Sequence, residues 1–135
     1  MVLFLSLLAF LNSFSPKVKI ENAWVRPAAK GMNSALYFNI NNITAKADAL
    51  YKVTSKVAEL VQLHATVKNA DGTEGMKEIK QIAVPANGVI KFEPGGYHVM
   101  LINLKNKLKV NSKIEFTFYF KTGGNVKVKA VVKKE

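Results

Sequence analysis

Two soft metal ligands stand two residues apart in the segment Tyr97-His98-Val99-Met100. Successive side chains of a β-strand point to opposite faces, so this imidazole and this thioether would emerge on the same face. Residues 93–96 read Glu-Pro-Gly-Gly, which is typical of a tight turn. The pair is therefore expected near a strand end, where a ligand can approach. Taken singly, His98 could equally be a hydrogen-bonded strand histidine and Met100 a core residue.

A second imidazole and a second thioether stand upstream of this pair. His64 closes the candidate strand 60–64, and Met76 follows the polar stretch 65–75, which contains an Asp-Gly turn signal. We expect this stretch to be a loop that bends the thioether of Met76 back toward an imidazole. The other interpretation is that Met76 covers a hydrophobic cluster beneath its loop.

Together these side chains form a neutral set of two nitrogens and two sulfurs. A set of imidazoles and thioethers without carboxylates suits Cu(I) far better than magnesium, calcium or manganese. The chain has no cysteine, which excludes blue-copper, zinc–thiolate and iron–sulfur centres. Thioethers form no disulfides and can hold copper in an oxidising compartment. Met32 stands outside the set as a candidate auxiliary contact. We predict one Cu(I) site made of His64, Met76, His98 and Met100.

The composition gives little support to an enzyme. Only two histidines are present and no Gly-x-Ser-x-Gly sequence occurs, which leaves little room for a Ser-His-Asp triad. The lack of cysteine also removes thiol nucleophiles. We therefore expect a protein that binds its metal and hands it over, and not one that turns over a substrate.

The chain of 135 residues is strongly basic, with 20 Lys and Arg against 9 Asp and Glu and a formal net charge of +11. Such an excess is compatible with nucleic acid, an anionic surface or an acidic protein as partner. The lysines are scattered, and some alternate with apolar residues, as in Lys127-Val128-Lys129, which is typical of solvated strand faces. The alternative function is a basic β-barrel that binds single-stranded nucleic acid or an anionic surface, using the aromatic segment 116–120.

The N-terminal segment from Met1 to Leu11 is apolar. It is too short for a membrane-spanning helix, which needs about 20 residues, but it fits the hydrophobic part of an export signal. We predict that residues 1–15 are a signal peptide or an N-terminal anchor through which the chain could contact a membrane. Residues 16–135 would then be a single copper-binding β domain in the periplasm or another extracytoplasmic space. A short apolar strand or helix docked on the domain is the alternative.

The body of the chain has the period of β-strands. Apolar residues alternate with polar ones over residues 113–121, and a Gly-Gly turn leads into a return strand at 126–132. The further candidate strands are 18–25, 35–41, 49–54, 59–65, 76–84, 88–93 and 97–103. Eight or nine short strands separated by turn residues predict an all-β fold, an antiparallel sandwich or barrel.

The spacing of the four predicted ligands resembles that of the periplasmic copper chaperones that serve the dinuclear copper site of cytochrome c oxidase, the PCuAC-like proteins. Their pattern is a His, an optional Met, ten residues, a Met, twenty-one residues and His-x-Met. In this chain the pattern is met by His64, Ala65 at the optional position, ten residues, Met76, twenty-one residues, His98, Val99 and Met100. The segments 22–27, 58–64, 82–88 and 94–101 also resemble this family.

This resemblance covers roughly residues 20–132 and carries expectations about fold and partners. It implies a cupredoxin-like, antiparallel Greek-key β-fold that binds one Cu(I). It also implies that the copper passes to the copper-site subunit of the oxidase or to a thioredoxin-like assembly protein. Nucleic acid is not an expected partner under this interpretation.

Overall fold

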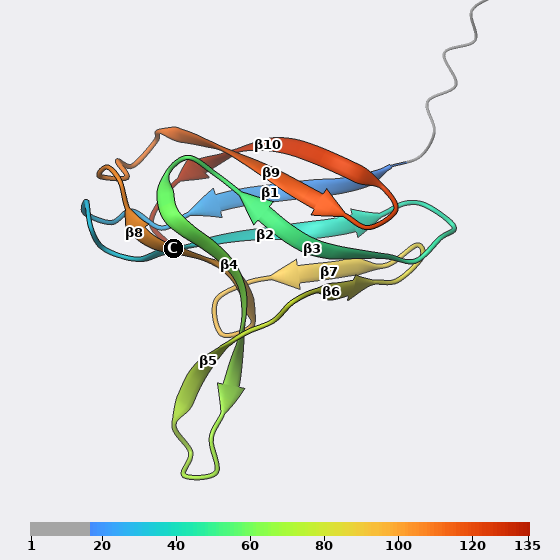
Figure 1. Cartoon of the computed structure of the whole chain (residues 1–135), viewed down its shortest axis with the longest axis horizontal. Coiled ribbons are helices and arrows are strands. Elements are labelled where there is room, and N and C mark those ends of the chain that lie inside the picture. Colours follow the sequence, from blue (N-terminus) through green and yellow to red (C-terminus); the bar gives the residue numbers. More distant parts are fainter. Residues whose placement is uncertain (1–16) are drawn as a thin grey trace, which may run out of the picture.

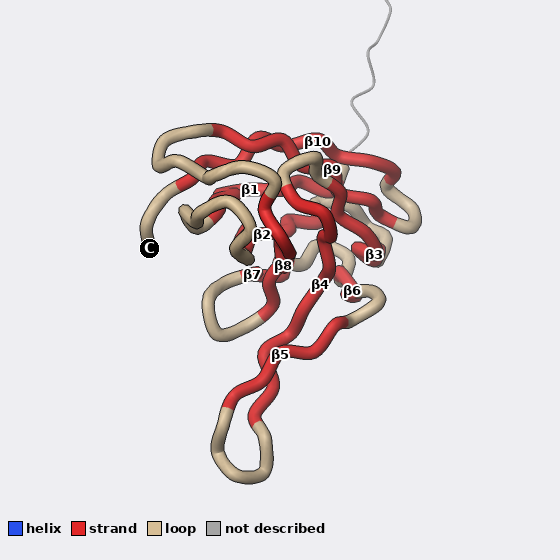
Figure 2. Tube along the Cα trace, turned by 60° about the vertical axis from the view of Figure 1, so that its left-hand side comes forward, coloured by secondary structure: helices blue, strands red, loops and turns tan. Residues whose placement is uncertain are grey.

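The computed structural model describes residues 17–135, and this part of the chain consists of ten strands and their connections (Figures 1 and 2). It contains no helix, so in residues 17–135 no helix could span a membrane. These observations confirm the all-β prediction. Residues 1–15, predicted to be a signal peptide or anchor, lie outside the described residues.

The strands form one hydrogen-bonded network. In chain order they are β1 Val18–Val25, β2 Ser34–Asn42, β3 Asp48–Thr54, β4 Ala58–Lys68, β5 Glu74–Glu78, β6 Ile82–Val84, β7 Val89–Phe92, β8 Tyr97–Leu104, β9 Lys113–Phe120 and β10 Gly124–Val132. Their spatial order is β5-β4-β8-β2-β1-β10-β9-β3-β6, with β7 paired to β2. The pairs of described strands are antiparallel except for β1 and β10, which run parallel. The predicted antiparallel sandwich therefore contains one parallel pair.

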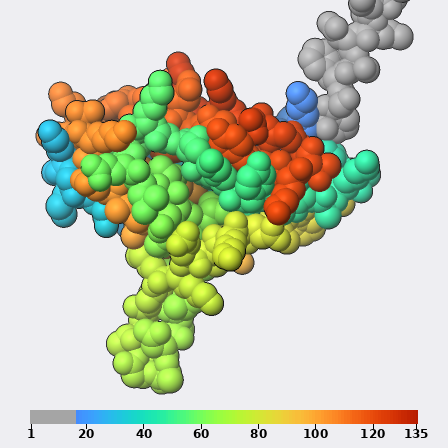
Figure 3. Space-filling view, viewed as in Figure 1, coloured from blue at the N-terminus to red at the C-terminus, as the bar shows by residue number. Residues whose placement is uncertain are grey.

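Strand β2 is the point at which the network divides. Its first residues, 34–36, pair with β8, whereas residues 38–41 pair with β7. Strands β4 and β5 continue beyond the body as a projecting hairpin, called here the arm and comprising residues 65–78 (Figures 1 and 3). Strand β8 pairs with β2 on one side and with β4 on the other. Strand β5 of the arm pairs with the opposite edge of β4.

Aromatic and aliphatic side chains from several strands fill the core. The ring of Phe38 stacks on Phe92 at a centroid distance of 4.2 Å and meets Phe118 edge-on at 4.8 Å. Such contacts stabilise a core beyond the burial of their area alone. Phe116, Phe118 and Phe120 are all buried, as the alternation over residues 113–121 predicted. These three rings of the aromatic segment are therefore not available to stack on nucleic-acid bases.

The prediction of a single strand over residues 76–84 was wrong. Strand β5 pairs with β4, whereas β6 pairs with β3 in a different part of the network. The main-chain N–H of Ile79 still donates to the carbonyl of Leu63 at 2.9 Å, after which the chain bends at residues 80–81. Residues 76–84 contain no glycine or proline that would mark this bend, so the sequence does not show the change of partner strand.

The predicted loop over residues 65–75 is mostly strand. Strand β4 extends to Lys68 and β5 begins at Glu74, so only residues 69–73 form the turn at the tip of the arm. The Asp71 carboxylate accepts hydrogen bonds from the Thr73 main-chain N–H at 3.0 Å and from its hydroxyl at 2.6 Å. Gly72 adopts a φ of +87° there, a conformation that glycine takes without steric cost. Met76 is therefore placed by strand pairing and not by a bending loop.

Candidate metal centre

Strands β4 and β8 place the two histidines directly opposite each other. His64 pairs with His98, and Gln62 pairs with Met100. Cross-strand partners project to the same face of a sheet, so both imidazoles and the thioether of Met100 share one face. The centroids of the two imidazole rings are 5.5 Å apart. Val99 and Leu101, which alternate with these side chains along β8, are fully buried on the opposite face, in the core.

Strand β5 adds Met76 to the same face. Met76 pairs with Thr66, which follows His64 by two residues and so points the same way. The Met76 side chain is 60% exposed, in contrast to His98 at 3%. The four predicted ligands thus lie on one face of three adjacent strands, although they are far apart in the sequence.

A cavity of about 230 Å³ lies at this face. Three of the predicted ligands, Met76, His98 and Met100, contribute to its wall. The other wall residues come from the β1–β2 side and are Arg26, Pro27, Asn33, Ser34, Ala35 and Tyr37. His64 does not line this cavity, but its ring neighbours that of His98, which does. The region therefore has a buried nitrogen side and an exposed sulfur side.

Both imidazoles carry one nitrogen without a partner. Among residues 17–135, the buried side-chain nitrogen and oxygen atoms that lack a hydrogen bond are Nδ1 of His64 and Nε2 of His98. The other ring nitrogens are engaged, since His64 Nε2 lies 2.8 Å from Gln62 Oε1 and His98 Nδ1 lies 3.5 Å from the Gly96 carbonyl. Buried polar atoms are normally paired because an unpaired one costs free energy. Two unpaired nitrogens on one face fit a metal centre.

Burial controls the charge of the two imidazoles. Desolvation lowers the pKa of His98 and outweighs the opposing effect of the Gly96 carbonyl, while the charges of His64 and Arg26 lower it further. Desolvation also lowers the pKa of His64, and the carboxylate of Glu78 offsets part of this effect. A lowered pKa favours the neutral imidazole at neutral pH, which is the form that can donate a lone pair to a metal.

An aromatic wall adjoins His98. The Tyr37 ring centroid lies 6.5 Å from that of His98 and 4.8 Å from that of Trp24. The Arg26 guanidinium lies over Tyr37 at 5.2 Å and forms an ion pair with Glu135 at 2.9 Å. Burial raises the pKa of the Tyr37 hydroxyl, and the Arg26 charge opposes this shift. No local sequence signal marks Tyr37 or Arg26 as part of this site, because the position of β2 next to β8 brings them to the cavity.

Other candidate ligands do not extend the set. Met32 is 60% exposed and does not line the cavity, although the next residues, Asn33 and Ser34, do. Within residues 17–135 no group of three or more His, Asp or Glu side chains is arranged to hold a metal ion. The donors that do converge are thus imidazole and thioether groups.

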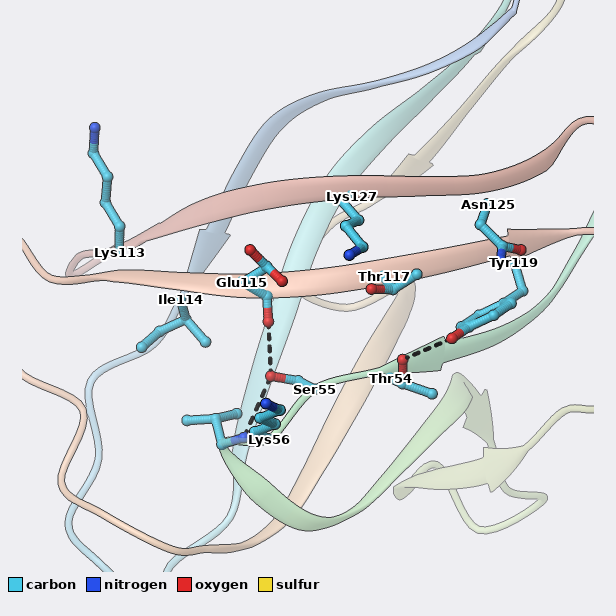
Figure 4. Close-up of a pocket in the computed structure, with 11 residues that line it drawn as sticks. Thr54, Ser55, Lys56, Lys113, Ile114, Glu115, Thr117, Tyr119, Asn125 and Lys127 are labelled. Carbon is cyan, nitrogen blue, oxygen red and sulfur yellow. Dashed lines mark hydrogen bonds between the residues drawn. The ribbon is translucent and has the colours of Figure 1, made fainter.

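A larger depression of about 860 Å³ lies between β3 and β9 (Figure 4). Its described lining includes three lysines, Lys56, Lys113 and Lys127, and no histidine or methionine. The Ser55 hydroxyl donates to the Glu115 carbonyl at 2.9 Å within it. This chemistry is basic and hydroxyl-rich, so the depression, called here the basic depression, is unsuited to a soft metal ion.

Two solved structures resemble this fold closely. The copper-bound PCuAC domain from PmoF2 has a TM-score of 0.73 and 28% identity, covering 88% of this chain and 94% of that domain. The Cu(I) form of DR1885 from Deinococcus radiodurans has a TM-score of 0.67 and 26% identity, covering 91% of this chain and 84% of that one. These similarities confirm the resemblance to PCuAC-like proteins that the residue spacing indicated.

Two curated relatives match in sequence. "Putative lipoprotein Lxx21020" of Leifsonia xyli subsp. xyli (strain CTCB07) is 35% identical over 117 residues, which is 86% of this chain and 69% of that protein. "Uncharacterized protein RP573" of Rickettsia prowazekii (strain Madrid E) is 28% identical over 107 residues, and the match spans 76% of this chain and 59% of that protein. The family model "Putative lipoprotein LpqE-like" matches residues 18–132. The chain therefore belongs to the LpqE-like family.

Proposed function

We propose that this protein is an extracytoplasmic copper chaperone that binds one Cu(I) through His64, Met76, His98 and Met100. The observation that carries the proposal is the position of these four side chains on one face, with an unpaired buried nitrogen on each imidazole. Support also comes from the copper-bound PCuAC domain of PmoF2 and the Cu(I) form of DR1885, which have similar folds.

The donor set suits the cargo. Imidazole and thioether groups prefer Cu(I) to hard divalent ions, and neutral ligands require no negative charge from a chain with a net charge of +11. Thioethers cannot be lost to disulfide formation in an oxidising compartment. Neutral imidazoles are maintained by burial, which lowers the pKa of both histidines. The site can therefore hold Cu(I) outside the cytoplasm without thiols.

Exposure of the donors suggests how copper leaves. Met76 is mostly exposed on the arm, Met100 is half-buried, and His98 is almost completely buried. An acceptor can thus displace the Met76 thioether first and the His98 imidazole last, exchanging ligands one at a time. Copper would then never be released free into solution.

The acceptor proposed here follows from the family resemblance. It is the copper-site subunit of cytochrome c oxidase or a thioredoxin-like protein of oxidase assembly. An extracytoplasmic location, in the periplasm or an equivalent space, agrees with the lipoprotein description of the family and of the Leifsonia relative. The proposed reaction is transfer of a bound ion and involves no catalytic turnover.

The test is an anaerobic Cu(I) titration of the protein against a chromophoric Cu(I) chelator, followed by X-ray absorption. We expect one Cu(I) per chain with two nitrogen and two sulfur neighbours. Titration without a stoichiometric endpoint, or a copper shell without sulfur, would contradict the proposal. A Met32→Leu variant serves as the control, because Met32 is as exposed as Met76 but lies outside the proposed ligand set.

A further inference from the structure

We infer that Gln62 is a positioning residue that fixes the imidazole of His64, so that His64 presents Nδ1 to the metal while His98 presents Nε2. This inference rests on the proposed function and deepens it, because it assigns the donor atoms and a residue that orients one of them. Gln62 was not among the ligands predicted from the sequence, and its role is visible only in the contacts of the folded chain.

The contact between Gln62 and His64 selects one tautomer. Gln62 Oε1 lies 2.8 Å from His64 Nε2, and an amide oxygen only accepts hydrogen bonds, so His64 Nε2 must carry the proton. A neutral imidazole then has its free lone pair on Nδ1. That atom is the buried nitrogen of His64 that lacks a hydrogen-bond partner. The hydrogen bond and the unpaired atom therefore agree on which nitrogen is available.

Strand geometry holds Gln62 in this role. Gln62 precedes His64 by two residues on β4, so both side chains point to the same face. Its cross-strand partner is Met100, which places the amide between one predicted nitrogen donor and one predicted sulfur donor. The amide is neutral and adds no charge to the ligand set. Glu78, the cross-strand partner of His64 on β5, is the charged group that faces the imidazole from the other side.

His98 is oriented in the opposite sense by the main chain. Its Nδ1 lies 3.5 Å from the carbonyl of Gly96, in the turn before β8, and its Nε2 is the unpaired buried atom. A carbonyl also only accepts hydrogen bonds, so the proton resides on Nδ1. This contact is long, but the ring is further held by burial, being 3% exposed. Of the two orienting contacts, only that of His64 depends on a side chain that a substitution can remove.

The experiment compares Gln62→Leu, which removes the acceptor, with Gln62→Glu, which keeps one. Gln81→Leu is the control, because Gln81 is exposed and lies outside the site. Long-range ¹H–¹⁵N spectra of the copper-free, ¹⁵N-labelled protein at about pH 8, where both imidazoles are neutral, report the tautomer of each histidine. The same spectra after addition of one equivalent of Cu(I) under anaerobic conditions report which nitrogen binds. Main-chain ¹H–¹⁵N spectra show whether each variant is folded.

We expect the copper-free protein to hold His64 with its proton on Nε2 and His98 with its proton on Nδ1. Gln62→Leu should mix the tautomers of His64 alone and weaken Cu(I) binding by about 10-fold to 100-fold, as is typical when a partner of a metal-bound histidine is lost. Gln62→Glu should keep the tautomer, and Gln81→Leu should change neither quantity.

Finding His64 protonated on Nδ1, or an unchanged tautomer and affinity in Gln62→Leu, would overturn the role of Gln62. The tautomer measurement needs no copper, so it judges this inference even if Cu(I) fails to bind. Failure of wild-type protein to bind Cu(I) would instead reject the proposed function. Copper addition that leaves His64 protonated on Nδ1 and bound to the metal through Nε2 would overturn the assignment of the donor atom.

Discussion

Two regions of the same β network differ in the chemistry of the side chains that line them. On β4, β5 and β8 the candidate donors and Gln62 are neutral imidazole, thioether and amide groups, Glu78 is the charged neighbour of His64, and two buried nitrogens have no partner. On β3, β9 and β10 the lining side chains include lysines, hydroxyl groups and Tyr119, and the hydroxyl of Ser55 is already hydrogen-bonded. The lysine-rich surface of β3, β9 and β10 therefore carries no histidine or methionine that could bind a soft metal ion. Unpaired buried atoms mark the candidate site better than charge does.

The face of β4, β5 and β8 that carries His64, Met76, His98 and Met100 is called here the metal face. The substitution expected to have the largest effect is His98→Leu, which removes the most buried donor of this face. Because the lost nitrogen binds the metal directly, Cu(I) affinity should fall by more than the roughly 100-fold that loss of an outer partner can cause. Chelator competition under anaerobic conditions measures the change. Lys127→Gln in the basic depression is the matched control and should leave the affinity unaltered. Equal affinities for the two variants would remove the distinction between the regions.

A smaller effect is expected when one exposed thioether is deleted. Met76 and Met32 are both 60% exposed, so Met76→Leu and Met32→Leu remove equally accessible sulfurs while roughly conserving side-chain volume. Met76→Leu should weaken Cu(I) binding about tenfold, equivalent to ~1.4 kcal/mol, whereas Met32→Leu should not. The same titration as above measures both variants. A larger loss from Met32→Leu would mean that the sulfur donor had been assigned to the wrong residue.

Part of this comparison could be predicted from sequence because its signals are local. The period-two burial of Phe116 and Phe118 and the common face of His98 and Met100 depend only on the alternation along one strand. The spacing of the predicted ligands also indicated the family. Partner choice between strands was not predictable in this way, since residues 76–84 contain no glycine or proline to mark the change from β4 to β3 as neighbour.

The surroundings of the candidate site were beyond the reach of local patterns. Tyr37 approaches His98 because β2 lies next to β8, and nothing in the segment around Tyr37 marks it as part of a metal site. The roles of Gln62 and Gly96 depend on single hydrogen bonds, which determine the position of a proton and not the fold. The parallel pairing of β1 with β10 joins the two ends of the described chain, a long-range contact that turn residues do not encode.

Acid should weaken the metal face in two related ways. Because burial lowers the pKa of His64 and His98 in the folded protein, the unfolded chain binds protons at a higher pH than the folded one. The associated stability is present above the ordinary histidine pKa of about 6.5 and is lost as the pH falls through the lower folded values. Urea unfolding of the copper-free protein between about pH 7.5 and 5 should reveal this loss.

Copper affinity should fall over the same acidic range, because only neutral imidazoles donate to the metal. His98→Leu is the control for the stability measurement and should unfold with a weaker dependence on pH than the wild-type protein. A Cu(I) affinity that stays constant through this range would contradict ligation by histidine. A wild-type stability that rises on acidification would contradict the lowered pKa values.

The smallest effects are expected in the basic depression. Lys127 is paired across the ladder with Thr117 and has no ion pair among the described residues, so Lys127→Gln should change the free energy of unfolding by less than about 0.5 kcal/mol.

The buried positions of Phe116, Phe118 and Phe120 leave Tyr119 as the outward ring of that segment. With the exposed Tyr51 of β3, whose ring centroid lies 6.3 Å from that of Tyr119, this surface offers two neighbouring rings, fewer than the series of rings on which successive bases stack. Oligonucleotide binding without copper should thus be weak, and it is measured by fluorescence anisotropy over a series of salt concentrations. Tight binding with a steep salt dependence that Lys127→Gln reduces would transfer the functional role from the metal face to the basic depression.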